Sequence, residues 1–560
     1  MTRTLLASSV EQPRAIARRR WPGLLGLALV TEGLYVLLVL MLRPIAGLGL
    51  VPTPLSALPS WNGLALPLSR IGAISLLLTL LLALAACYLL AIWRAWAGDY
   101  PGQVGWMSGL LVGPPLLFGL TLLPLPALFS DTLFASLFSG RLIALYGLSP
   151  WRTVSPALVS DPYWPWLTPL TQHGPLVAGP LWEWLCALVA LLPASASPAL
   201  GLLLLRSLLL LVHLLNTFLI WSLLGRLAAA PGTRFAASLL YAWNPLALLA
   251  MVADGHSEGL LLTLLLVALW WLLRREEWAR TSERSALLAE VAALLALGLA
   301  VALSPLALPL WPLLVGFSLW RRAGKVRTLS ARLWAWTWRL LLPVAVPLLL
   351  ALPLWRGGES YRAVMAAAGW TSFARSPLAL VVPPLRRLYA PLAVLLDSPR
   401  YRRPDQPAEL TVKGGALFCF TWLFIWLLVS LRAQLHGRRQ EASQEALVGS
   451  FAHVQAFSSL IATCLLALGA WLLLLGFNFW PWYALPGLGL AALRRPDALS
   501  RSGLLFSLTS LLSFALLGVG SFLGLALEGL LIFAPPLVYL TGVFFWRGRR
   551  AIFKEARSSA

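Results

Sequence analysis

Ionisable residues at three separate places in the chain have the side chains that acid–base chemistry needs. They are Asp131 and Arg141 in FSDTLFASLFSGRL, His173 in TQHGPL, and Asp254, His256 and Glu258 in ADGHSEG. Carboxylates and imidazoles can take up or donate a proton during a reaction. Arg206 and His213 lie inside a long apolar run, where a polar side chain is costly and tends to mark a site. These residue types predict an active site assembled from segments far apart in the sequence.

Each of these residues also has a structural interpretation. Asp131 could cap the helix that it begins, because its side-chain oxygen can accept an orphan backbone N–H. The DGHSE group could be a polar turn between helices. Arg206 and His213 could form interhelical hydrogen bonds. Four further ionisable residues are interpreted as structural acids or as cytoplasmic histidines, namely Glu32, Glu528, His436 and His453.

The composition determines what kind of protein must position these side chains. Of 560 residues, 59% are hydrophobic and 11% are charged, whereas soluble domains carry about a quarter charged residues. A water-soluble globular protein is therefore excluded. The net charge of +22 does not indicate nucleic acid as a partner, because no soluble domain is available to present a basic face. The four cysteines lie singly in apolar stretches without metal-ligand spacing, so no metal is expected.

The basic residues orient the apolar runs, since Arg and Lys collect on the cytoplasmic side of a membrane. We predict an all-α, polytopic transmembrane helix bundle that is multi-pass in the cell membrane, with both termini cytoplasmic. About fourteen crossings are expected, near residues 22–43, 72–93, 104–128, 200–224, 235–253, 259–273, 286–302, 305–320, 340–354, 414–431, 450–474, 483–493, 503–519 and 525–545. In this orientation Asp131, His173 and the DGHSE turn all lie on the extracytoplasmic side.

Two extracytoplasmic loops are expected, at 129–196 and 356–413. The first loop contains a predicted interfacial helix at 131–146 that would lie flat in the membrane surface. Its lipid-facing residues would be Phe134, Phe138, Leu142 and Leu145. The run at 176–193 is predicted to dip into the membrane without crossing, because a full crossing would invert every later loop.

The second loop contains many arginines although it is predicted to lie on the extracytoplasmic side. It is long enough that the rule relating positive charge to the cytoplasmic side does not apply to it. Beyond Arg356, at which the loop begins, its arginines are Arg362, Arg375, Arg386, Arg387, Arg400, Arg402 and Arg403. Two interpretations stay open. The loop lies on anionic head groups, or it helps to hold a phosphate-bearing ligand.

The order of several motifs resembles the GT-C superfamily of integral-membrane glycosyltransferases, especially the bacterial polyprenyl-phosphate-mannose-dependent mannosyltransferases. The matching elements are Asp131 after an early span, YGLSP at 146–150, HGPL at 173–176, NPL at 244–246, GHSE at 255–258 and FWPWY at 479–483. The sequence departs from the family pattern at Ser149, at Ser257 and Glu258, and at Ser304, where Asn, Asn-Asp and Lys are usual. No DxD motif follows Asp131, so metal dependence is not supported.

The resemblance implies inverting transfer of a sugar, mannose by the closest likeness, from a polyprenyl-phosphate donor to a lipid, glycan or protein acceptor at the external face. Asp131 would be the catalytic base, and no cofactor is expected. The donor's phosphate and sugar would be bound among Arg141, His173, Arg206, Asp254, His256 and Glu258. Trp480, Trp482 and Tyr483 offer an aromatic platform for sugar or lipid, although interfacial aromatic belts have the same composition.

The resemblance divides the chain into three parts. Residues 1–103 form an N-terminal helix pair, 104–490 a GT-C-like core with both external loops, and 491–560 a C-terminal helix pair with a basic tail. Two other classes of function remain open. A flippase for lipid-linked saccharides, or another secondary transporter, would also place charges such as Glu32, Arg206 and Glu528 within the membrane. A non-catalytic scaffold is disfavoured by the long Trp-rich external loop.

Overall fold

The computed structural model describes residues 8–41, 68–97, 104–125, 129–279, 281–320, 328–367, 373, 375–395, 405–444, 449–516 and 522–558. Throughout this part of the chain the regular elements are helices, and the one β-type contact is an isolated bridge between Thr153 and Pro175. The high content of Leu and Ala explains this outcome, because both residues favour helices. The all-helical prediction is confirmed for the described residues.

The helices between residues 8 and 351 come first in the chain. They are α1 (Ser8–Leu40), α3 (Arg70–Ala97), α4 (Val104–Leu122), α5 (Thr132–Ala144), α6 (Pro169–His173), α7 (Pro180–Ala190), α8 (Pro198–Arg226), α9 (Pro231–Ala242), α10 (Pro245–Leu248), the π-helical turn η5 (Leu249–Ala253), α11 (Glu258–Trp278), α12 (Glu283–Leu303), α13 (Trp311–Trp320) and α14 (Leu329–Ala351). The elements that follow are α15 (Gly358–Ala367), α16 (Val382–Leu395), α17 (Asp405–Gln444), α18 (Gly449–Leu474), the 3₁₀ turn η9 (Pro481–Ala484), α19 (Leu485–Ala492), α20 (Ala498–Ser513) and α21 (Phe522–Ser558).

Ten helices of the described chain are long and apolar enough to cross a membrane, or eleven if the bent pair of α9 and α10–η5 is one span. Fourteen crossings are therefore not confirmed. Of the remaining expected spans, α13 and α19 have 10 and 8 residues and reach only about half of the hydrocarbon thickness. The third, α11, is 21 residues long but has an ionisable residue at its start and four near its end.

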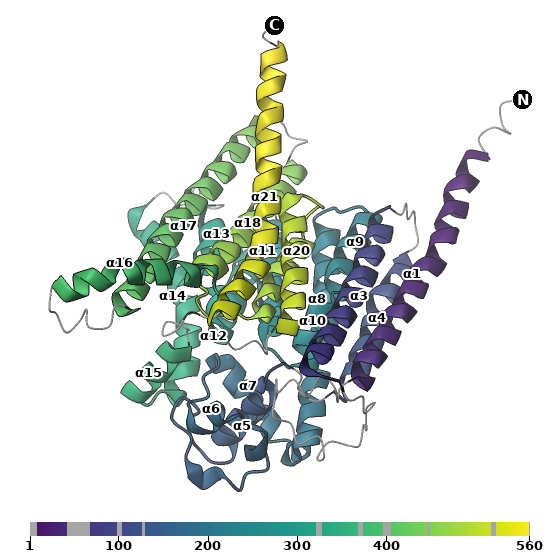
Figure 1. Ribbon diagram of the computed structural model, residues 1–560. Coiled ribbons are helices and arrows are strands. Elements are labelled where there is room, and N and C mark those ends of the chain that lie inside the picture. The colour runs from purple at the N-terminus through teal and green to yellow at the C-terminus, as the bar shows by residue number, and fades with distance from the viewer. Residues whose placement is uncertain are drawn as a thin grey trace, which may run out of the picture.

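The long helices run side by side in Figure 1, with the start of α1 and the end of α21 at the upper end of the bundle. The short helices α5, α6, α7 and α15 lie at the lower end. This arrangement places the two ends of the described chain on one side and the first predicted external loop on the other.

The helix α5 differs from its prediction. Phe134, Phe138 and Leu142 are at most 2% exposed, so the expectation that they face lipid is wrong, and only Leu145 is exposed. Phe134 stacks on Trp166 and Phe138 meets the edge of Trp164. The apolar face that the sequence pattern assigned to lipid is instead covered by the Trp-rich segment.

The helix α7 packs against the opposite side of α5. At Gly140 a Cβ atom would lie 2.2 Å from the carbonyl oxygen of Cys186, so the two helices approach closely where Gly has no side chain. With 11 residues, α7 spans about 16 Å, half of the hydrocarbon thickness. This length agrees with a segment that does not cross. We call residues 129–196 the α5–α7 unit.

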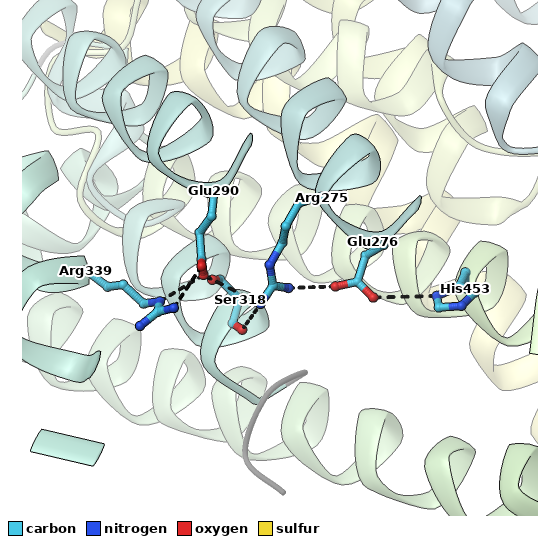
Figure 2. A network of polar contacts seen from close by, with 6 residues as sticks. All are labelled: Arg275, Glu276, Glu290, Ser318, Arg339 and His453. Atoms are coloured by element: carbon cyan, nitrogen blue, oxygen red, sulfur yellow. Dashed lines mark hydrogen bonds and ion pairs between the residues drawn. The ribbon is translucent and has the colours of Figure 1, made fainter. Parts of the chain in front are cut away.

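A buried ionic network fastens α11, α12, α13, α14 and α18 together (Figure 2). It consists of Arg275, Glu276, Glu290, Ser318, Arg339 and His453. Arg339 holds both carboxylate oxygens of Glu290 at 2.8 Å, and Arg275 pairs with Glu276 at 2.6 Å. Because Arg275 lies in the last turns of α11, the network is about 25 Å along this helix from Glu258 in its first turn.

Candidate active site

The turn that precedes α11 is shaped by a break in the helix before it. Asn244 caps α10 through the N–H of Ala247, Pro245 occupies the first helical position, and η5 ends the segment as a π-helical turn. Gly255 then adopts a φ of +71°, which only glycine adopts without strain. A Cβ atom at Gly255 would lie 2.0 Å from the Leu133 side chain, so this turn presses against the start of α5.

The carboxylate of Asp131 is bound by two threonines of the α5–α7 unit. Its Oδ2 atom accepts hydrogen bonds from the Thr168 N–H at 3.1 Å, the Thr168 hydroxyl at 2.8 Å and the Thr171 hydroxyl at 2.9 Å. Asp131 occupies the N-cap position of α5, but its side chain makes no capping hydrogen bond. The capping interpretation is therefore wrong. Its Oδ1 atom accepts no hydrogen bond from any residue in the described ranges, so one oxygen is oriented and the other is unoccupied.

The residues just before Asp131 contact the DGHSE turn directly. The Phe129 N–H donates to Asp254 Oδ1 at 3.3 Å, and the Ser130 hydroxyl lies 3.3 Å from His256 Nε2. Asp254 and His256 are almost fully buried. The structure therefore brings together two segments that are more than 120 residues apart, as the sequence analysis expected.

Burial sets the charge of the imidazole at this contact. It holds the pKa of His256 well below its usual range, so the ring is neutral at pH 7. His256 can contribute a hydrogen bond to a bound anion, but not the full positive charge of an imidazolium.

Two of the predicted phosphate-binding arginines are already engaged. Arg206, fully buried in α8, donates to the carbonyl oxygens of Leu123, Leu125 and Ala253. It thus braces the end of α4 against η5. Arg141 pairs with Asp161 at 2.9 Å.

Aromatic groups complete the surroundings of Arg141. The Tyr146 hydroxyl donates to the same Asp161 oxygen at 2.7 Å, and the Arg141 guanidinium lies 5.2 Å from the Tyr163 ring centroid. Arg141 and Asp161 are both buried, as is typical of an ion pair that stabilises the fold, here within the α5–α7 unit.

His173 and Glu258 lie in contrasting environments. His173 is exposed at the end of α6, with its ring 6.5 Å from Trp164 in an edge-on arrangement. Glu258 is 7% exposed, and its Oε2 atom has no hydrogen-bond partner in the part of the chain that the structure describes. His173 shares the short α6 with Thr171, the residue that binds Asp131.

The aromatic FWPWY segment packs against the DGHSE turn. The Trp482 ring stacks on His256 with 3.4 Å between ring centroids, and Trp480 stacks on Trp482 at 4.8 Å. Tyr483 meets Trp482 edge-on at 6.4 Å. Trp482 is 5% exposed, so it belongs to the protein interior beside the candidate site rather than to a lipid-facing belt.

Sequence reasoning missed the partners that orient these groups. Thr168, Thr171, Ser130 and Asp161 were not singled out, although Thr168 followed by Pro169 is a recognisable helix start. The Trp-rich segment that carries three of them has no period from which contacts could be predicted. Among the described residues, no group of three or more His, Cys, Asp or Glu side chains could hold a metal ion.

The helices and the buried polar turn define a multi-pass membrane protein in which several ionisable residues converge beside the α5–α7 unit. Residues 30–320, just over half of the chain, match the family model for the N-terminal domain of alpha-(1->6)-mannopyranosyltransferases. The chain belongs to this mannosyltransferase family, which confirms the resemblance to GT-C-type mannosyltransferases. The matched residues extend from α1 to the end of α13 and include Asp131 and the DGHSE turn. No curated protein and no solved structure was found to match.

Proposed function

We propose that the protein transfers mannose from a polyprenyl-phosphate carrier to an acceptor hydroxyl at the extracytoplasmic face, with inversion at the anomeric carbon and Asp131 as the base. The observation that supports this proposal is the hydrogen bonding of the two Asp131 carboxylate oxygens. Two threonines hold Oδ2, while Oδ1 is left without a partner among the described residues. A general base requires this combination of a fixed orientation and an available lone pair.

The reaction is a single displacement. The acceptor oxygen attacks the anomeric carbon on the face opposite the phosphate, and its proton passes to Asp131 Oδ1 as the new bond forms. The bond between the anomeric carbon and the phosphate oxygen breaks, and its electrons leave with the polyprenyl phosphate. The negative charge that develops on this leaving group must be stabilised by cations or N–H donors.

The substitution Asp131→Asn tests this assignment. Asparagine keeps an oxygen that can accept the Thr168 and Thr171 hydrogen bonds, but it cannot take up the proton. We expect a folded membrane protein without transfer activity when membranes are incubated with radiolabelled polyprenyl-phosphate sugars. A matched control is Glu359→Gln. This substitution removes an exposed carboxylate of α15 that pairs with Arg152. Full activity of the Asp131 variant would remove this residue from the mechanism.

The competing proposal is a flippase that moves the intact lipid-linked sugar. The observation that favours it is that α11 has a buried charged residue near each end, Glu258 at its start and Arg275 near its end. The same incubation separates the two functions, because a flippase leaves the sugar–phosphate bond intact. Labelled polyprenyl-phosphate sugar recovered unchanged, with altered sidedness, would support the transporter.

A further inference from the structure

We propose that Arg375 binds the phosphate of the sugar donor and that Glu528 orients its guanidinium group for this purpose. The inference rests on the proposed function and names the anion-binding residue of that site. Arg375 belongs to the second predicted external loop, whose arginines cannot be distinguished from one another by sequence. Glu528 lies in α21 and was interpreted as a structural acid.

The hydrogen bonding of Arg375 is incomplete. Its side chain is 8% exposed, and its Nε atom lies 3.1 Å from each carboxylate oxygen of Glu528. The four N–H groups on its two Nη atoms donate to none of the residues that the structure describes. Neither Nη atom is among the fully enclosed polar atoms that lack a partner, so both can be reached by a ligand and can donate to it.

Other buried arginines make a clear contrast. Arg141 uses Nε and Nη2 on Asp161, Arg206 uses both Nη atoms on backbone carbonyl oxygens, and Arg339 uses all three nitrogens. Arg375 therefore presents the donor pair that suits bidentate contact with a phosphate. Glu528 engages the guanidinium through Nε and leaves that pair available.

A column of stacked rings connects Arg375 with the candidate active site. The Arg375 guanidinium lies 4.1 Å from the Trp480 ring centroid, Trp480 stacks on Trp482, and Trp482 stacks on His256. His256 in turn meets Ser130, the neighbour of Asp131. The anion-binding group and the proposed base thus stand at the two ends of one continuous set of contacts.

The backbone holds Arg375 in an unfavourable conformation. Its φ is +56°, in the left-handed region that residues other than glycine rarely adopt. Close packing from α21 accompanies it, because a Cβ atom at Gly529 would lie 2.4 Å from the Arg375 carbonyl oxygen. Strained backbone of this kind is concentrated at ligand-binding and active sites.

The experiment measures binding of a polyprenyl phosphate to the purified full chain, with the polyprenol of equal length as the second ligand. The wild type should bind the phosphate more tightly than the alcohol. Arg375→Gln should weaken binding of the phosphate by about 10- to 100-fold, as expected for lost charged hydrogen bonds, and leave polyprenol binding unchanged. The affinity of Arg375→Lys for the phosphate should lie between those of the wild type and Arg375→Gln. Arg362 is an exposed arginine of the same loop, and Arg362→Gln should bind the phosphate as the wild type does.

Three outcomes would contradict the inference or its premise. Equal loss of affinity for both ligands in Arg375→Gln and Glu528→Gln, with a lower melting temperature in both, would show that the pair only stabilises the fold. An Arg375→Gln variant that keeps the wild-type preference for the phosphate would refute the assignment of Arg375 alone. A wild type without any preference for the phosphate would instead contradict the proposed function.

Discussion

Glu183 should make the stability of the α5–α7 unit depend on pH. The side chain lies in α7 at 1% exposure, where it accepts hydrogen bonds from the Ser139 hydroxyl and from the Ala178 N–H, the latter at 3.0 Å. Burial raises its pKa from 4.5 to about 8, against the opposing effects of the Ala178 and Trp151 N–H groups. The folded protein therefore carries this carboxyl group protonated at pH 7.

The sign and size of the effect follow from proton linkage. Between pH 4.5 and 8 the unfolded chain releases the proton while the folded chain keeps it, so stability is highest below 4.5 and is lost as pH rises through 8. At 1.36 kcal/mol per pH unit, the loss is at most roughly 5 kcal/mol. Glu183→Gln removes the ionisation and keeps an oxygen acceptor, so the variant should lack this contribution to the pH dependence of stability.

The assay is thermal unfolding of the purified protein in detergent, followed by tryptophan fluorescence from pH 5 to 8.5 at one scan rate. The melting temperature of the wild type should fall with pH relative to that of Glu183→Gln, and the gap should level off above pH 8. Glu359→Gln serves as a control, because this carboxylate is half exposed. Parallel curves for the wild type and the Glu183 variant would refute the buried, protonated state.

Two further predictions concern the far end of α11 and the orientation of the chain. Glu290→Gln should lower the melting temperature markedly, because breaking a buried ion pair costs about 3–5 kcal/mol, whereas Glu290→Leu combined with Arg339→Leu should recover much of the loss. An unchanged melting temperature in the single variant would contradict this role. In a Cys419→Ser background, a cysteine in place of the exposed Val159 should react with an impermeant reagent from outside intact cells. Labelling only after permeabilisation would invert the predicted topology.

The sequence predicted the long helices and the meeting of Asp131's segment with the DGHSE turn, because both depend on strong signals. Apolar runs identify helices, and ionisable residues at membrane depth identify places where segments converge. The FWPWY motif packs on the DGHSE turn through Trp482 and His256, a contact that the sequence did not predict, and its role as an aromatic platform stays a prediction. The fourteen crossings and the three-part division of the chain stay predictions.

The identity of side-chain partners could not be predicted in the same way. Periodicity marks an apolar face but does not tell lipid from protein, so α5 was assigned to the membrane surface although tryptophans cover Phe134 and Phe138. Arg141 was assigned to phosphate because its partner Asp161 lies in an irregular segment whose path depends on tertiary packing. Arg375 could not be distinguished from its neighbours until the strained backbone and the contact with Glu528 were known.

The ionic network of Figure 2 means that the matched N-terminal residues are not a separable module. The family match ends at Trp320, yet Glu290 lies before this point and its partner Arg339 lies after it. A fragment that ends at α13 would lack Arg339, and the buried carboxylate of Glu290 would lose this ion-pair partner. Changes at position 290 during evolution would thus need compensating changes in a part of the polypeptide that the family comparison leaves unmatched.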